Sequence, residues 1–209
     1  IGTGDWSSDV CSSDLVLKAF AGSNLTLVLD TSMLWDEFCL IEVCLAWGGR
    51  SVPLAQLVLE HGSATVGFED YRVVLETAKA VLPAECSVMF LADRGFQHGA
   101  LLRWLQQQNW DWAIRAKSDL QVTLANGITH SVESLLPPTQ QAYLFHDVTV
   151  LETINAHLAT ANVPIAGETW AVLSNRPPSL QTFATYGERF GGIEPHFKDY
   201  KSAAFDVLR

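Results

Sequence analysis

The chain has 209 residues, of which 13 are Lys or Arg and 23 are Asp or Glu, so its formal net charge is -10. This acidic balance argues against a self-sufficient nucleic-acid-binding domain, because neutralising phosphates requires an excess of basic side chains on some face. It leaves open a nuclease fragment whose basic domain is separate. No run reaches the ~18 uninterrupted apolar residues of a membrane span, so no membrane association is predicted.

The first fifteen residues have no helical or strand periodicity and none of the regions of a signal peptide. From Asp5 to Leu15 they resemble, codon by codon, the read-through of a common sequencing adapter oligonucleotide. We therefore interpret residues 1–15 as a non-native leader, with a natural polar leader as the alternative. Without them the charge is 13 minus 20, or -7, because three aspartates and no basic residues are removed.

The rest of the chain is long enough to bury a proper core. Its three cysteines, Cys39, Cys44 and Cys86, lack C-x-x-C spacing. They are interpreted as reduced core residues, which is typical of a cytoplasmic protein.

Residues 16–118 are predicted to form an α/β core. The apolar, β-prone run Leu25–Leu29 indicates a buried strand that Asp30 closes. Two further strands, at 38–47 and 52–59, flank the Gly48-Gly49 turn and complete an antiparallel meander.

Helices and strands then alternate. Helical spacing of apolar residues indicates two helices, and short apolar runs indicate two strands. In order, the predicted elements are a helix at 68–82, a strand at 87–92 that ends in Asp93, a helix at 97–108 and a strand at 111–117. The resulting order is βββαβαβ, which favours α/β layering with a mixed sheet.

Residues 119–178 are predicted to be a β-rich insertion. The Asn126-Gly127 pair is a strong hairpin signal, and further strands are expected at 143–151 and 169–174. Residues 179–209 return to helix, first at about 180–189 and again from about Glu194, with Pro195 suited to a first helical turn.

Three acidic residues stand out by their order along the chain. Asp30 ends the first strand, Asp93 ends the strand after the first helix, and Glu194 lies on a late helix. This order matches the acidic trio of ribonuclease-H-like folds, in which the first and fourth strands are neighbours. Carboxylate oxygens are the ligands that Mg²⁺ prefers, and two such ions suit phosphodiester cleavage.

At these residues the chain resembles the DDE transposases of bacterial insertion sequences, specifically the "IS four" type. Leu29-Asp30-Thr31 is similar to that family's first acidic motif and Leu91–Phe96 to its second. The stretch from Tyr186 to Lys201 is similar to the third, the Tyr-Arg-Glu-Lys signature. The resemblance implies Asp30, Asp93 and Glu194 as catalytic metal ligands, and Tyr186, Arg189 and Lys201 as DNA phosphate contacts.

The chain departs from the signature at one place. The family usually has three residues between Arg and Glu, whereas four separate Arg189 from Glu194. The other two spacings agree with the pattern: two residues lie between Tyr186 and Arg189, and six lie between Glu194 and Lys201. Glu188 is therefore kept as the reserve candidate for the third ligand.

The resemblance implies a transposase catalytic domain that uses two Mg²⁺ ions, with Mn²⁺ as a substitute, to cut transposon ends and carry out strand transfer. Its expected partners are terminal-inverted-repeat DNA, target DNA and, at full length, a second copy in a homodimer. One alternative is another ribonuclease-H-like nuclease of the resolvase type. The other is an inactive remnant of a truncated element, since relatives extend beyond both ends of residues 16–209.

Overall fold

The computed structural model describes residues 20–83, 85–163 and 168–203, so the predicted leader lies outside the described residues. The strands are β1 Asn24–Leu34, β2 Phe38–Trp47, β3 Arg50–Glu60, β4 Ser87–Ala92, β5 Asp111–Arg115, β6 Gln121–Thr123, β7 Thr129–Ser131, β8 Ala142–Val150, β9 Ile154–Val163 and β10 Glu168–Ser174. The α-helices are α2 Phe68–Val81, α3 Gly99–Gln107 and α4 Gln181–Ala203, and short 3-10 turns are η2 Arg94–Phe96 and η3 Val132–Leu135.

All ten strands belong to one mixed sheet in the order β3-β2-β1-β4-β5-β10-β9-β8-β6-β7. The pairs β1–β4 and β4–β5 are parallel, and the other paired neighbours are antiparallel. Because β10 pairs with β5, the β-rich segment predicted at 119–178 continues the sheet of the core.

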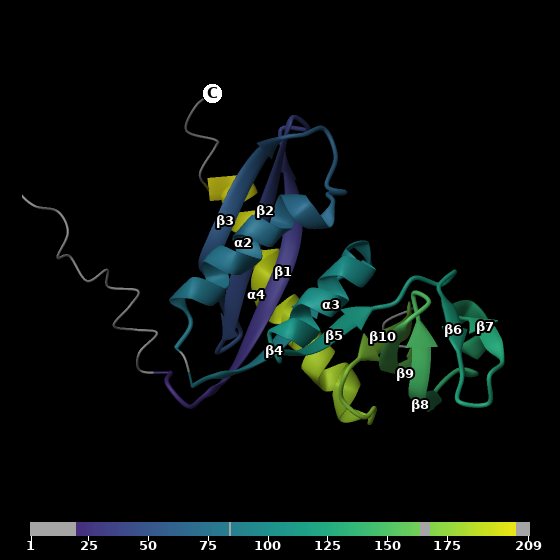
Figure 1. Cartoon of the computed structure of the whole chain (residues 1–209). Helices are drawn as coiled ribbons and strands as arrows, with labels where there is room; N and C mark the ends of the chain where they lie inside the picture. The colour runs from purple at the N-terminus through teal and green to yellow at the C-terminus, as the bar shows by residue number, and fades with distance from the viewer. Residues whose placement is uncertain (1–19, 84, 164–167, 204–209) are drawn as a thin grey trace, which may run out of the picture.

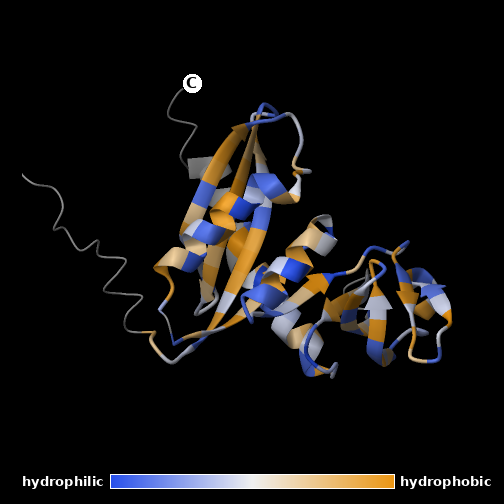
Figure 2. Cartoon of the chain, in the orientation of Figure 1, coloured by the Kyte–Doolittle hydropathy of each residue, from blue (hydrophilic) through white to orange (hydrophobic). Residues whose placement is uncertain are grey.

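The helices cover the two faces of the sheet (Figure 1). α2 and α3 pack on one face, where Leu27, Tyr71 and Leu105 belong to one buried cluster. α4 packs on the opposite face, where Val28 and Tyr186 belong to a second cluster. Figure 2 shows hydrophobic residues concentrated in the strands between these layers. In the described part of the chain, no helix is both long and apolar enough to cross a membrane.

β1 is longer than the predicted strand at 25–29. It runs through Asp30 to Leu34, and Leu34 still pairs with Phe38 of β2. The antiparallel partner supplies backbone hydrogen bonds beyond the end of β4, so the strand continues where the parallel pairing stops. The expectation that Asp30 closes the strand is thus wrong, and Asp30 lies within it.

α4 is one continuous helix, whereas the sequence predicted a break between about residues 189 and 194. Tyr186, Arg189, Ile193 and Phe197 follow each other at spacings of three or four, so they share one face, and all four are buried. The predicted burial of Ile193 and Phe197 is confirmed. Burial of this face against the sheet accounts for a helix that continues through Pro195.

β9 was not predicted. It pairs with β8 through a reversal in which Leu151 and Glu152 have φ of 47° and 71°. Left-handed backbone is usually marked by glycine or asparagine, and neither residue occupies this turn. The sequence therefore carries no ordinary signal for the hairpin.

The turn at Gly127 gives a stability prediction. Gly127 has φ +82° and a Cβ built there meets nothing within 4 Å, so Gly127→Ala should lower the free energy of unfolding by about 1 kcal/mol through backbone strain alone. Gly187 lies inside α4 with equally open surroundings, so Gly187→Ala should raise it by up to about 1 kcal/mol. Urea denaturation measures the change in unfolding free energy of each variant. If both variants were stabilised or both destabilised, the backbone conformation assigned to one of the two glycines would be wrong.

Candidate active site

The parallel pairing of β1 and β4 brings two aspartates together. The last register pair is Leu29 with Ala92, so Asp30 and Asp93 are the next residues on neighbouring strands. Oδ1 of Asp30 accepts a hydrogen bond from the N–H of Thr31 at 2.9 Å. Oδ1 of Asp93 accepts one from the N–H of Arg94 at 2.7 Å, as the cap of η2. Each carboxylate is oriented by its own backbone, and its second oxygen is left for other partners.

Two residues of α4, Arg189 and Glu194, lie near Asp30, and Arg189 contacts it directly. Nη2 of Arg189 lies 2.6 Å from Oδ2 of Asp30, and Nη1 lies 3.8 Å from Oε1 of Glu194. The side chains of Arg189 and Asp30 are 6% and 15% exposed, whereas that of Glu194 is 55% exposed. The close contact with Asp30 is thus a largely buried ion pair, and Glu194 lies at its solvent-facing edge.

The three carboxylates influence one another. Burial raises the pKa of Asp30 from 3.8 to about 6, and Arg189 and the Thr31 N–H oppose this rise. The charges of Asp93 and Glu194 make smaller contributions to this rise, which means that both lie close enough to act on Asp30. A cluster of like charges needs a cation nearby, and Arg189 supplies one.

This raised pKa predicts a pH dependence of stability. Because the pKa of Asp30 is about 6 in the folded protein and 3.8 for an ordinary aspartate, the folded state binds this proton more tightly, and that stabilisation is lost as pH rises through 6. Between pH 4.5 and 7.5, without metal, the wild type should lose about 2 kcal/mol more unfolding free energy than Asp30→Asn. Denaturant titrations at both pH values measure the difference, and an equal loss in the two proteins would exclude Asp30 as its source.

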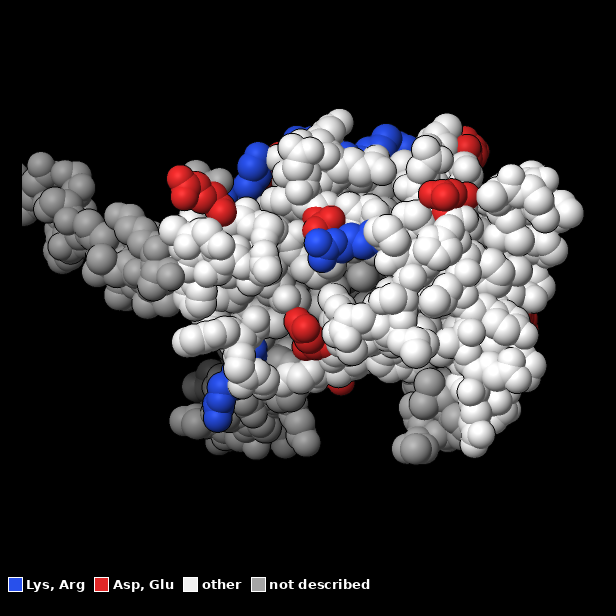
Figure 3. Space-filling model, turned by 90° about the horizontal axis from the view of Figure 1, so that it is seen from below, with Lys and Arg blue, Asp and Glu red and all other residues white. Residues whose placement is uncertain are grey.

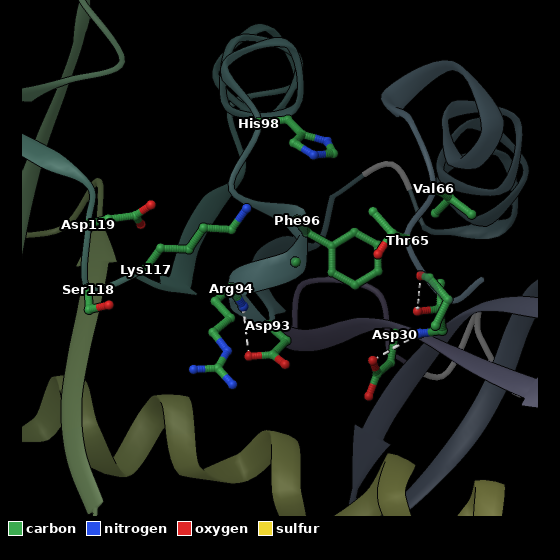
Figure 4. A pocket seen from close by; sticks show the side chains of 13 residues that line it. Asp30, Thr65, Val66, Asp93, Arg94, Phe96, His98, Lys117, Ser118 and Asp119 are labelled. Carbon is green, nitrogen blue, oxygen red and sulfur yellow. Dashed lines mark hydrogen bonds between the residues drawn. The ribbon is translucent and has the colours of Figure 1, made fainter.

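A cavity of about 710 Å³ opens beside the two aspartates. Asp30 and Asp93 line one side, and His98 and Lys117 line the other (Figure 4). Arg94 follows Asp93 along the same wall. The cavity therefore combines acidic and basic groups, as a site for a phosphate ester and its metal ions requires.

The donor chemistry of this centre fits Mg²⁺, since Asp30, Asp93 and Glu194 offer carboxylate oxygens. Within the described residues, however, no three His, Cys, Asp or Glu side chains are grouped closely enough to hold a metal ion. Arg189 occupies Oδ2 of Asp30 in this arrangement. A metal ion would therefore take the place of the guanidinium on that oxygen.

The other predicted site residues are placed differently. Tyr186 is 1% exposed and packs edge-on against Trp170 and Phe190, so in this conformation its hydroxyl does not face solvent. The Lys201 side chain lies outside the described residues. Oε2 of Glu188 accepts a hydrogen bond from Oγ1 of Thr26 at 3.0 Å, four residues before Asp30 on β1. The geometry thus favours Glu194 over Glu188 as the acid nearest Asp30.

His98, which lines the cavity, and its neighbour Gln97 were not singled out as functional from the sequence. Gln97 is buried, and its Oε1 accepts a hydrogen bond from the N–H of Lys117 at 2.7 Å. His98 has its Nδ1 2.8 Å from the hydroxyl of Tyr71. A glutamine and a histidine at a helix start give no sequence signal for such contacts, since both are ordinary surface residues there.

The face in Figure 3 carries no concentrated basic patch. Among the described residues on this face, basic and acidic side chains are few and scattered. It therefore lacks the clustered Lys and Arg side chains that typically mark a nucleic-acid-binding surface.

These features define a class of protein: an α/β domain in which two neighbouring parallel strands bring two aspartates to a cavity, and a late helix contacts one of them through Arg189, which also lies beside Glu194. The family model for the transposase DDE domain matches residues 38–209, so the chain belongs to that family. Asp93 and Glu194 lie inside the match, and Asp30 precedes it.

Comparison with solved structures agrees on the fold. The chain is similar to the piggyBac transposase in a cryo-EM synaptic complex with hairpin DNA, with a TM-score of 0.52 and 13% identity over 87% of this chain and 41% of that one. An Argonaute of Marinitoga piezophila with guide RNA and target DNA has a TM-score of only 0.32, at 10% identity over 78% of this chain and 24% of that one. No curated protein matches the chain.

Proposed function

We propose that this transposase DDE domain cuts DNA at transposon ends with Asp30, Asp93 and Glu194 as the ligands of two Mg²⁺ ions. The observation that carries the proposal is that Arg189 lies beside both Asp30 of β1 and Glu194 of α4, while Asp93 follows β4 next to Asp30 and acts on its pKa. The family match places the chain among the DDE transposases, but the ligand set rests on this geometry.

Each residue has a distinct task in this proposal. Metal ions held by Asp30, Asp93 and Glu194 would activate the attacking oxygen and stabilise the leaving one. Backbone hydrogen bonds from the N–H groups of Thr31 and Arg94 orient the carboxylates of Asp30 and Asp93, so these two side chains themselves need little reorientation. Glu194, which is exposed, can turn towards the ions without crossing the core. Arg189, released from Asp30, would be positioned for a bidentate phosphate contact.

Several finer features belong to the same proposal. We assign the chain to the "IS four" type, with a ribonuclease-H-like core, on the strength of its three motifs. Mn²⁺ should replace Mg²⁺, Lys201 should contact a DNA phosphate from α4, and the full-length protein should act in the cytoplasm as a homodimer. The piggyBac relative was seen with hairpin DNA, which makes a hairpin intermediate worth testing in this protein.

The experiment uses DNA that carries the inverted repeats flanking the element, incubated with the protein and either Mg²⁺, Mn²⁺ or EDTA. We expect cleavage at the repeat end with either metal, followed by joining of the freed 3'-hydroxyl to a target duplex. Metal-dependent cutting of branched DNA without joining would instead indicate the resolvase-type nuclease. Absence of any cutting by the folded protein would indicate an inactive remnant.

A further inference from the structure

Lys117 presents an uncompensated positive charge to the cavity. Its backbone is fixed by the hydrogen bond to buried Gln97, while its side chain is exposed. Figure 4 shows this side chain reaching from the end of β5 into the cavity, towards His98. Over the described residues, no ion pair involves the Lys117 ammonium. Asp119 also lines the cavity, but its carboxylate lies apart from the ammonium in Figure 4.

His98 offers a second donor on the same wall. Its ring stacks on Tyr71, with centroids 6.0 Å apart and an interplanar angle of 23°. Burial raises the pKa of Tyr71, so the phenol keeps its proton and can donate it to Nδ1 of His98. That arrangement leaves the hydrogen of the neutral imidazole on Nε2. Burial, and then Lys117, lower the pKa of His98, which keeps the ring neutral at pH 7.

We infer that Lys117 and His98 bind a backbone phosphate of the DNA strand, next to the phosphate that is cut at Asp30 and Asp93. The inference rests on the proposed function of the acidic centre. In this inference, one wall of the cavity cuts one phosphate, and the opposite wall binds the neighbouring phosphate of the same strand.

The chemistry of the cavity supports a phosphate as the occupant. A lysine ammonium is a mobile point charge that suits a phosphate, and a neutral histidine N–H adds a directed hydrogen bond. The volume of about 710 Å³ lies within the range of about 300–1,000 Å³ typical of sites for small ligands, enough for a nucleotide. An acidic protein also needs local cations wherever a DNA strand approaches its carboxylates.

The test measures affinity for terminal-repeat DNA in EDTA, where no cleavage occurs. Lys117→Gln should weaken binding about tenfold, equivalent to about 1.4 kcal/mol, and should reduce the slope of log affinity against log salt by about 0.9. A set of DNAs, each with one neutral methylphosphonate near the cleavage position, locates the phosphate. When the methylphosphonate stands at one particular position next to the cut, the affinity of wild type should fall by about the same factor. The affinity of Lys117→Gln for that DNA should fall no further.

Lys79→Gln is the matched control, because Lys79 is exposed on α2 and does not line the cavity. It removes the same charge and should change affinity less than twofold. Two results would overturn the inference. One is a Lys117→Gln protein that binds the DNA as tightly as wild type, and the other is a Lys117→Gln protein whose affinity falls by the same factor on every methylphosphonate DNA.

The two proposals can fail separately. Asp30→Asn should lose cleavage and still show the Lys117 effect on binding. If wild type cuts DNA but Lys117→Gln binds normally, only the phosphate site is wrong. If the Lys117 effect appears at one phosphate but the folded protein never cuts DNA, only the proposed activity is wrong.

Discussion

Asp30→Asn and Asp93→Asn are each expected to slow Mg²⁺-dependent cleavage at the transposon end by about three orders of magnitude or more. Each replacement would remove one anionic ligand of the proposed metal centre. Metal stabilisation of the transition state is worth several kcal/mol, and each 1.36 kcal/mol corresponds to about tenfold in rate. DNA binding in EDTA should stay within a few-fold of wild type, because neither carboxylate attracts phosphate. Single-turnover cleavage of labelled DNA, with binding measured in parallel, checks both outcomes.

The third ligand is tested by a matched pair on α4. Glu194→Gln should slow cleavage as strongly as the aspartate replacements, because Glu194 lies beside Arg189 and Asp30. Glu188→Gln makes the same chemical change six residues earlier, where the carboxylate contacts Thr26. This variant should slow cleavage less than about fivefold. The reverse ranking would transfer the ligand role to Glu188. Retained cleavage in Asp30→Asn or Asp93→Asn would remove that residue from the site.

Arg189→Ala is expected to lower the free energy of unfolding by about 3 kcal/mol in EDTA. The substitution leaves the Asp30 carboxylate largely buried without its cation, and breaking such a pair costs about 3–5 kcal/mol. Lost packing against Phe190, which the guanidinium faces at 5.5 Å, adds to the effect. Urea denaturation at pH 7.5, where Asp30 is ionised, measures the loss.

Mg²⁺ should restore part of that stability in Arg189→Ala, because a cation bound by Asp30 replaces the missing charge and binding to the folded state alone stabilises it. Arg176→Ala is the control, since Arg176 pairs with Asp111 at 3.1 Å on the exposed surface and should cost less than about 1 kcal/mol. An Arg189→Ala protein as stable as wild type in EDTA, or one that Mg²⁺ does not stabilise, would contradict the ion-pair role.

Much of the core could be predicted because its strands are short apolar runs with clear ends. β4 has the predicted bounds, since Cys86 and Asp93 flank an uninterrupted apolar run. β1 was predicted too short, because Asp30, Thr31 and Ser32 interrupt the apolar run and the strand beyond Leu29 is held by pairing with β2 alone. β9 was missed, because its turn uses left-handed backbone at Leu151 and Glu152.

The family of the protein was predictable from the sequence, whereas the contacts of the candidate site were not. Membership of the DDE transposases, expected from the motifs around Asp30, Asp93 and Glu194, is confirmed by the family match. The ribonuclease-H-like order of elements predicted that the strands before Asp30 and Asp93 are neighbours, and β1 does pair with β4. It could not show that Arg189 turns inward to Asp30, since this depends on how α4 packs across the sheet.

Crystals of the protein grown with Mn²⁺, examined by anomalous diffraction at the manganese edge, test the central claim most directly. We predict manganese peaks within coordination distance of the carboxylates of Asp30, Asp93 and Glu194, with the Arg189 guanidinium displaced from Oδ2 of Asp30. Manganese bound only elsewhere, with the Arg189–Asp30 ion pair intact at saturating Mn²⁺, would contradict the claim that these acids form the metal centre.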